Sequence, residues 1–312
     1  MALPVQVVEA IGEGKKRTPP RQAVKSLTAR RWPSVRLLTG QSFSPSLWIG
    51  GAIVLLLLSS ALLAPLLTRY PPDLVVGEAR LQPPSAAHPF GTDALGRDMF
   101  SRVVYGARIA VWMAVVGVGI AAAAGVTLGL LAGYYSGWVD QVLSRVMEVW
   151  MAFPSLLLAI IIVARLGPSL RNAVVALGIV GAPSFYRLTR GCTISARQCA
   201  YVEATRAVGA SDRRILVRHI LPNIAPSLLV LATMRLGMLV LAGGGLSFIG
   251  LGAQPPQPEW GALLAAGRDY VDTAPWLAIF PGLCITLVVA GFNLFGDGLR
   301  DAMDPRWRRR HR

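Results

Sequence analysis

Two long apolar runs without a charged residue constrain this chain more than any other feature of its sequence. Leu47–Leu67 and Ile109–Tyr134 contain no Asp, Glu, Lys or Arg. A helix that crosses the hydrocarbon core of a bilayer needs about 20 such residues. Only 15% of all residues are charged, well below the roughly 25% of a soluble domain. The sequence therefore predicts a polytopic membrane protein embedded in the lipid bilayer, and it argues against a soluble or disordered chain.

The hydropathy pattern predicts six transmembrane helices and hence an all-α fold. The expected spans are Leu47–Leu67, Ile109–Tyr134, Val149–Ala164, Asn172–Tyr186, Pro226–Ser247 and Ala274–Phe295. The third and fourth are short, and charged side chains at their ends must reach the membrane interface. The chain is thus divided into a basic tail 1–45, a first helix 46–68, a loop 69–108, a core 109–297 with five spans, and a basic tail 298–312.

Lysines and arginines gather in three places and set the orientation. They lie in the tail 1–45, in the loop 187–222 after the fourth span, and in the tail 298–312. With six spans all three fall on one side, and the positive-inside rule makes that side the cytoplasm. We expect a multi-pass protein of the cell (plasma or inner) membrane with both termini cytoplasmic. The net charge of +15 is then explained without a nucleic-acid partner, and none is expected.

The motifs of several chemistries are absent from the sequence. It has no GxxxxGK[ST] phosphate-binding loop and no paired-histidine zinc pattern. Its three cysteines cannot form a disulfide framework. His88, with Asp93 and Asp98 after it, has no second imidazole or thiol beside it. We expect no catalytic residue, no metal and no cofactor, and the chain is not predicted to be an enzyme.

Arg235 is the one formal charge deep inside a predicted span. An ionisable residue within a membrane indicates a functional site by default. Arg235 is therefore a candidate for the substrate pathway, where it would meet a substrate carboxylate. The alternative is a structural contact to a partner subunit or to carbonyl groups at a helix end.

The loop 187–222 has the pattern of a helical corner rather than a flexible linker. Residues 200–208 are good helix formers, and Gly209 supplies the left-handed residue that ends a helix. Ser211 or Asp212 can then cap a second short helix, and Pro222 is expected to reset the backbone before the fifth span. A rigid basic corner of this kind is suited to receive force from another protein. The alternatives are a plain surface hairpin and, less compatible with a membrane protein, a DNA-binding helix-turn-helix.

The loop 69–108 is predicted to contain a short amphipathic helix. Thr92 or Asp93 can cap it, and Leu95, Met99 and Val103 would form its apolar side. Asp98 and Arg102 have the spacing of an ion pair within a helix. Such a helix would brace an outer gate, form a docking surface, or simply pack.

The region after the fifth span combines glycines, prolines and tryptophans. Residues 243–252 are rich in glycine, which permits a close approach of helices or a bend. Three prolines within 255–258 predict a stiff extended connection. Trp260 and Trp276 are expected to be anchors at the membrane interface.

Four blocks, in family order, resemble the permeases of ABC importers of the dipeptide, oligopeptide and nickel group. The first is His88–Asp98, the third is Leu246–Gly252, and the fourth runs from Gly298 to Arg306 with Asp301, Asp304 and Pro305 at the matching positions. The second block resembles the EAA loop, with Glu203, Ala204, Gly209, Leu221 and Pro222 at the family spacing. Departures are Thr205 for the usual second alanine, His219 for isoleucine, and Gly243–Gly245 where an acidic residue often precedes the third block.

The resemblance implies a type I ABC importer permease of MetI-like architecture that forms half of a pore for peptides or related solutes such as nickel complexes. It implies four kinds of partner: a homologous permease in a heterodimer, two ABC ATPase subunits that hydrolyse the ATP, and an extracytoplasmic solute-binding protein. The residues it assigns to ATPase coupling are Glu203, Ala204, Thr205, Gly209, Ala210, Ser211, Asp212, Leu221 and Pro222.

Two other classes of function stay open on the residues alone. A self-contained channel or secondary transporter for small solutes would need no ATPase, but the predicted spans lack the carboxylates that ion-coupled transporters usually bury. A membrane scaffold that transports nothing is the third possibility.

Overall fold

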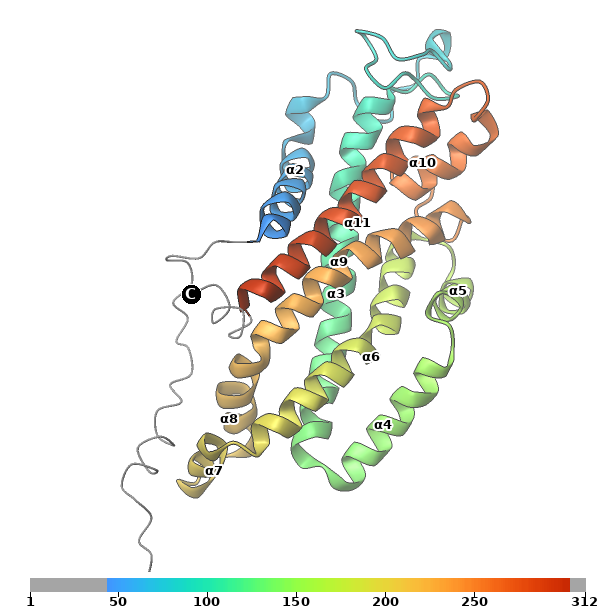
Figure 1. Ribbon diagram of the computed structural model, residues 1–312. Coiled ribbons are helices and arrows are strands. Elements are labelled where there is room, and N and C mark those ends of the chain that lie inside the picture. The colour runs from blue at the N-terminus through green and yellow to red at the C-terminus, as the bar shows by residue number, and fades with distance from the viewer. Residues whose placement is uncertain (1–43, 304–312) are drawn as a thin grey trace, which may run out of the picture. The chain divides into compact units, whose positions relative to one another are not determined.

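The computed structural model describes residues 44–303, and within them the regular elements are helices (Figure 1). In chain order they are α2 (Pro45–Leu67), η1 (Gly77–Ala79), α3 (Met99–Tyr135), α4 (Gly137–Ala152), α5 (Ser155–Leu166), α6 (Leu170–Arg197), α7 (Ala200–Ala207), α8 (Asp212–Ile215), the π-helical η2 (Leu216–Ile220), α9 (Leu221–Phe248), α10 (Trp260–Gly267), η3 (Arg268–Tyr270) and α11 (Trp276–Met303). The predicted all-α fold is confirmed. The basic residues of 1–43 and 304–312, together with Asp304 and Pro305, lie outside the described residues.

The six predicted spans correspond to α2, α3, the pair α4–α5, α6, α9 and α11. Four helical stretches are long and apolar enough to cross a membrane, namely Pro45–Leu67, Met99–Tyr135, Asp212–Phe248 and Trp276–Met303. The pair α4–α5 gives a fifth if its two halves are taken as one span. At 28 residues α6 has the length of a span, although four arginines lower its hydropathy.

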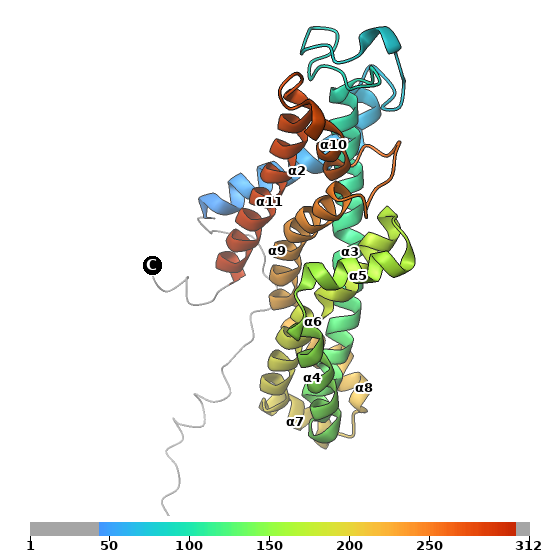
Figure 2. The same ribbon diagram turned by 90° about the vertical axis from the view of Figure 1, so that its right-hand side faces the viewer.

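The third predicted span, Val149–Ala164, is not one continuous helix, because α4 and α5 meet at an angle of 90°. The bend is visible in both views of the bundle (Figures 1 and 2). Proline disfavours the helical conformation in the residue before it and has no N–H to donate. Accordingly Phe153, which precedes Pro154, is extended with φ −91° and ψ 138°. The apolar run is continuous here, but the helix is interrupted.

The longest helix, α3, lies side by side with α6 in both views (Figures 1 and 2). Glycines at every fourth position of α3 face α6 at the contact. A Cβ on Gly125 would lie 2.3 Å from the carbonyl oxygen of Ala182, and one on Gly129 would lie 2.7 Å from that of Tyr186. Small residues of this kind let two helix backbones approach closely. With 37 residues at a rise of 1.5 Å each, α3 is about 55 Å long and extends beyond a hydrocarbon core of about 30 Å.

The expected short helix in the loop 69–108 does not form. Asp98 is the N-cap of α3 and accepts a hydrogen bond of 2.7 Å from the backbone N–H of Ser101, so the helical residues begin at Met99. Asp98 also contacts Nδ1 of His88 at 2.9 Å, and its predicted pair with Arg102 is absent. Gly96, with φ +78°, turns the chain just before this cap.

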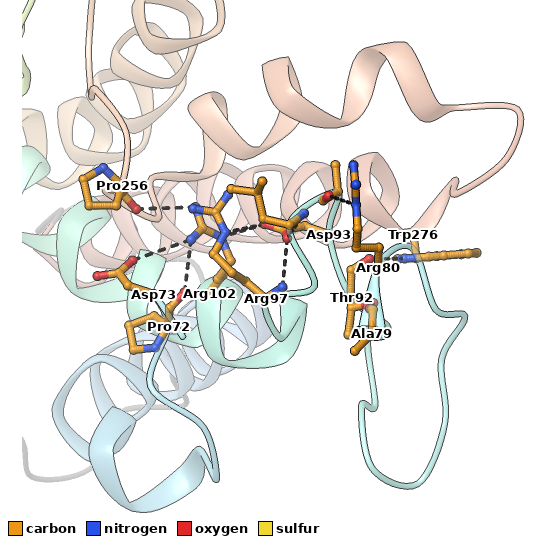
Figure 3. A network of polar contacts seen from close by, with 12 residues as sticks. Pro72, Asp73, Ala79, Arg80, Thr92, Asp93, Arg97, Arg102, Pro256 and Trp276 are labelled. Carbon is orange, nitrogen blue, oxygen red and sulfur yellow. Dashed lines mark hydrogen bonds and ion pairs between the residues drawn. The ribbon is translucent and has the colours of Figure 1, made fainter. Parts of the chain in front are cut away.

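Arg102 instead ties three segments together, as Figure 3 shows. Its side chain is 3% exposed and donates to the carbonyl oxygens of Pro72 at 3.0 Å and Pro256 at 3.5 Å. Carboxylate oxygens of Asp73 and Asp93 lie 3.6 and 3.8 Å from its nitrogens. The segment between α2 and α3 is thereby fixed to the start of α3 and to the α9–α10 connection.

The two tryptophans predicted as interface anchors use their indole N–H groups inside the protein. Trp260 is buried and donates to the carbonyl oxygen of Val103 at 2.9 Å. Trp276 donates to that of Thr92 at 3.2 Å, which joins the start of α11 to the α2–α3 segment (Figure 3). Trp260 therefore anchors α10 to α3 and not to the membrane interface.

A buried carboxyl lies at the contact between α9 and α10. Glu259 is 2% exposed, caps α10 by accepting from the N–H of Ala262 at 3.0 Å, and has its pKa raised by burial. The helices touch where a Cβ on Gly261 would lie 2.0 Å from the carbonyl oxygen of Gly244. The Glu259 carboxyl is 3.8 Å from the place of a Cβ on Gly244, so an acid from α10 stands beside the glycines that replace the acid of the family pattern.

Candidate coupling site

Residues 198–222, here called the elbow, form a sharp corner between two helices at one end of the bundle (Figure 1). After α7, Gly209 adopts φ +79°. Its N–H donates to the carbonyl of Arg206 at 2.9 Å, and the N–H of Ala210 donates to that of Thr205 at 3.3 Å. These two bonds are the Schellman motif, which ends a helix with a left-handed residue. The predicted role of Gly209 in the turn is confirmed.

The second arm of the elbow runs without a break into the membrane-spanning helix. Ser211 is the N-cap of α8, with no hydrogen bond from its side chain. From Asp212 the chain is helical to Phe248, through the π-helical turn Leu216–Ile220. The prediction that Pro222 separates the elbow from the span is wrong. Pro222 lies in the first turn of α9, where the wider π-helical turn shifts the carbonyl that its ring would otherwise meet.

A hydrophobic cluster holds both arms of the elbow against the ends of α3 and α6. Val202 from α7 and Ile215 from α8 are both 0% exposed. They pack with Leu130 and Tyr134 of α3 and with Ala196 of α6. Burying a branched aliphatic side chain contributes about 1.5–3 kcal/mol, so the elbow is fixed to the bundle by its own apolar residues.

Tyr134, at the end of α3, connects the two arms through its hydroxyl. The hydroxyl donates to a carboxylate oxygen of Asp212 at 2.6 Å and accepts from the guanidinium of Arg206 at 3.1 Å. The same guanidinium lies 5.6 Å from the centre of the Tyr134 ring. The hydrogen bond to Tyr134 raises the pKa of Arg206. One α3 residue thus contacts α7 and α8 at once.

The α3–α4 turn is tied to α6 close to the elbow. Arg197, the last residue of α6, donates to the hydroxyl of Ser136 at 2.6 Å. About two turns of α6 earlier, Arg190 forms an ion pair with Asp140 of α4 and donates to it at 2.6 Å. Arg197 and Arg190 thus fix the last turns of α6 to the α3–α4 turn and to α4.

The outward side of α7 is open for a partner. Glu203, Ala204 and Gly209 are exposed, and the apolar side chain of Val208 is 83% exposed. Within residues 44–303 the carboxylate of Glu203 has no ion pair or hydrogen bond. An exposed apolar tip beside an unpaired carboxylate fits a docking surface on a second protein better than a solvated hairpin.

The structure brings together most, but not all, of the candidate coupling residues. Those in the two short helices and the turn between them are Glu203, Ala204, Thr205, Gly209, Ala210, Ser211 and Asp212. Leu221 and Pro222 begin α9, about 13 Å further along the helix axis at 1.5 Å per residue. They belong to the support of the elbow and not to the exposed side of α7.

Arg235 is half-buried between helices and has a partner inside the chain. Its guanidinium donates to the hydroxyl of Ser184 in α6 at 2.6 Å. This bond joins α9 to α6 within the chain, a contact that was not among those predicted for Arg235.

The elbow lies within a region of the chain that matches a known protein family. Residues 125–309 match the family described as "Binding-protein-dependent transport system inner membrane component". The chain belongs to this family. The match includes the whole elbow, and it makes the chain a membrane-embedded transport component and not an enzyme.

Curated relatives match over most of the chain. The dipeptide transport system permease protein DppC of Alkalihalophilus pseudofirmus is 48% identical over 83% of this chain and 85% of its own. The glutathione transport system permease protein GsiD of Pectobacterium atrosepticum is 48% identical over 82% and 85%. The probable D,D-dipeptide transport system permease protein DdpC of Escherichia coli is 42% identical over 91% and 95%. The resemblance to dipeptide-type ABC permeases is confirmed.

A solved structure shows the same fold. A chain of the inward-facing MetNI methionine ABC transporter superposes with a TM-score of 0.55 and 20% identity, over 66% of this chain and 98% of its own. The MetI-like architecture expected from the sequence is thus confirmed.

Sequence reasoning missed the residues that support the elbow. In the sequence, Tyr134 was identified only as the end of a predicted span, and Arg206 only as one of the basic residues of the loop. Their contacts join positions 72 and 78 residues apart, which no local pattern encodes. One usable signal existed: Val202 and Ile215 are branched aliphatic residues in a loop that is rich in arginine.

Proposed function

We propose that this chain is one permease subunit of an ATP-driven importer for peptides and that its elbow is the docking site of an ATPase subunit. The observation that carries the proposal is the build of the elbow. Its exposed α7 side ends in a fixed left-handed turn at Gly209, and its buried side is bonded to α3 through Tyr134. A part that is open outward and rigid inward is suited to transmit force.

The proposed coupling uses two spanning helices. Closure of two ATPase subunits would move α7, and Tyr134 would carry this movement to α3. The continuous helix from Asp212 to Phe248 would carry it across the membrane through α9. ATP binding then favours one state of the pore and hydrolysis restores the other, which is alternating access by a shift of populations.

The assembly and the orientation form part of the same proposal. A homologous permease would complete the pore as a heterodimer, and an extracytoplasmic solute-binding protein would deliver the substrate. The elbow and both termini would lie in the cytoplasm, as the basic clusters favour, and the α2–α3 segment would lie outside. Peptides are the proposed substrates because relatives of 42–48% identity are named for dipeptides and glutathione.

Copurification tests the assembly first. The tagged chain, isolated from its native membrane in a detergent that preserves other ABC complexes, should carry a second permease and ATPases with phosphate-binding loops. Recovery of this chain alone, with uptake that persists after ATP depletion, would replace the importer with a self-contained channel or secondary transporter.

Two substitutions test the coupling role of the elbow. Glu203→Lys reverses an exposed charge, and Gly209→Asp adds a negative charge to the exposed left-handed turn. Both variants should assemble but lose ATP-dependent uptake and the stimulation of ATPase activity by loaded binding protein. Thr127→Ala, at an exposed position of α3, is the control. Normal coupling in both assembled variants would refute the docking role.

A further inference from the structure

A cavity of about 500 Å³, open to the surface and with both of its arginines exposed, lies between three elements that are distant in sequence. Arg108 and Trp112 of α3 form one wall, Ser169 and Arg171 at the start of α6 form another, and the α9–α10 connection contributes glutamines. Pockets of 300–1,000 Å³ with apolar walls and a few polar groups are typical of small-molecule sites. This cavity is at the opposite end of α3 and α6 from the elbow.

Neither arginine of this cavity has a carboxylate partner among the described residues, as is true of most arginines there. Arg97, Arg102 and Arg190 each have a carboxylate oxygen within 4.0 Å. Within residues 44–303 neither Arg108 nor Arg171 has one. The two guanidinium groups that line this cavity can offer charge-assisted hydrogen bonds to an anionic group such as a carboxylate.

The remaining groups of the cavity suit the rest of a short peptide. The ring of Trp112 and the side chain of Ile109 supply an apolar wall. Gln254 donates through its amide nitrogen to the carbonyls of Gly250 and Gly252 at 3.0 and 3.1 Å. That nitrogen is thereby occupied, which leaves the amide oxygen of Gln254 as an acceptor for an N–H group of a ligand.

We propose that Arg108 and Arg171 form a subsite for the free C-terminal carboxylate of a peptide in transit, with Trp112 beside an apolar side chain. The inference rests on the proposed peptide importer and adds a location and a chemical criterion. A lipid phosphate is the other anion that could satisfy the two arginines, and the test below separates the two.

Protection of an introduced thiol measures occupancy of the cavity directly. The reporter is Gln257→Cys, a lining residue, in the intact importer complex with the native thiols replaced by alanine. The native thiols are those of Cys192, Cys199 and Cys284. The rate of maleimide labelling is measured without ligand, with Ala-Phe, with Ala-Phe amide, and with glycerol 3-phosphate as a lipid headgroup probe. Asp272→Cys, an exposed position outside the cavity, reports any general effect of the ligands.

Ala-Phe should slow the labelling of Gln257→Cys about fivefold or more at saturation, whereas Ala-Phe amide should change it less than about twofold. The double substitution Arg108→Gln and Arg171→Gln should abolish the protection. Arg165→Gln, an exposed arginine at the end of α5 that does not line the cavity, should leave it unchanged.

Three outcomes would overturn the inference: equal protection by acid and amide, no protection by either, or protection by glycerol 3-phosphate in the absence of protection by peptide. These are separable from failure of the importer proposal. Protection by Ala-Phe in a complex without ATP-dependent uptake would leave the subsite standing and remove the importer, whereas ATP-dependent peptide uptake without protection would do the reverse.

Discussion

The left-handed turn at Gly209 offers a quantitative test, because its cost can be separated from any steric clash. Nothing lies within 4 Å of a Cβ built on Gly209, and the same is true of Gly191 in α6. The two glycines differ in backbone conformation: φ is +79° at Gly209, whereas Gly191 is helical. Alanine at Gly209 pays about 1–2 kcal/mol for a left-handed conformation. Alanine at Gly191 gains about 0.5–1 kcal/mol of helix stability.

The cost at Gly209 falls on the elbow and not on the bundle. About 1 kcal/mol corresponds to a roughly fivefold larger population of the open turn at 25 °C, since RT is about 0.59 kcal/mol. Gly209→Val should open it further, because β-branched residues are the least compatible with positive φ. Gly209→Asn should stay near wild type, because asparagine tolerates this region.

Amide hydrogen exchange of the peptide containing residues 205–212 measures the opening in the purified complex. The N–H groups of Gly209 and Ala210 are protected by the two bonds of the Schellman motif, and they should exchange in the order Val fastest, then Ala, then Asn and wild type. ATP-dependent uptake should be lowest in Gly209→Val, higher in Gly209→Ala, and highest in Gly209→Asn and the wild type. Equal exchange in all four proteins, or a loss of protection in Gly191→Ala as large as that in Gly209→Ala, would refute the reasoning.

Three further substitutions test the supports of the elbow and of α10. Tyr134→Phe removes the hydroxyl that bonds Asp212 and Arg206. It should lower the stability of the elbow by about 1–3 kcal/mol and abolish coupled ATPase activity. Tyr135→Phe, at a half-exposed ring, should leave that activity unchanged. Ile215→Ala empties a fully buried position and should lower the thermal stability of the complex by about 2–5 kcal/mol; the exposed Val217→Ala should change it by less than about 0.5 kcal/mol, and equal effects would contradict the packing described here. Burial raises the pKa of Glu259 above 4.5. Its protonated form therefore stabilises the fold at low pH, and this stability is lost as pH rises through the raised pKa. The melting temperature of the wild type should fall accordingly from acid to neutral pH, whereas that of Glu259→Gln should not, and identical pH dependence in the two proteins would argue against this role of Glu259.

Local sequence signals predicted the parts of the fold that local chemistry decides. Charge-free runs placed the spans, and Gly209 was identified from its neighbours alone, because a left-handed residue after a short helix needs nothing distant. Where two local signals competed, the prediction failed. The apolar run over Val149–Ala164 predicted one helix, but Pro154 bends it. Thr92 or Asp93 was predicted as the cap, but Asp98 caps α3, directly after the turn at Gly96.

The contacts that support the elbow, and those at the opposite end of α3, could not be predicted, because their partners are far apart in the chain. Arg102 bonds the carbonyl of Pro256 across 154 positions, and an ion pair with Asp98 four residues earlier was the nearest alternative. Tyr134 finds its partners on two helices whose placement depends on the complete bundle. The pairing of Arg108 with Arg171 in one cavity has the same origin, since it requires the packing of α3 on α6.

The unbroken course of α3 has a consequence for how this protein tolerates change. Asp98 starts the helix on one side of the bundle, and Tyr134 ends it at the elbow. Between them Gly125 and Gly129 must face α6. Inserting one alanine near residue 115 would leave the hydropathy intact, yet it would rotate everything after it by about 100° around the helix axis. The chain should therefore accept many substitutions in this helix but no change in its length, because the register of α3 fixes which residues meet at both ends.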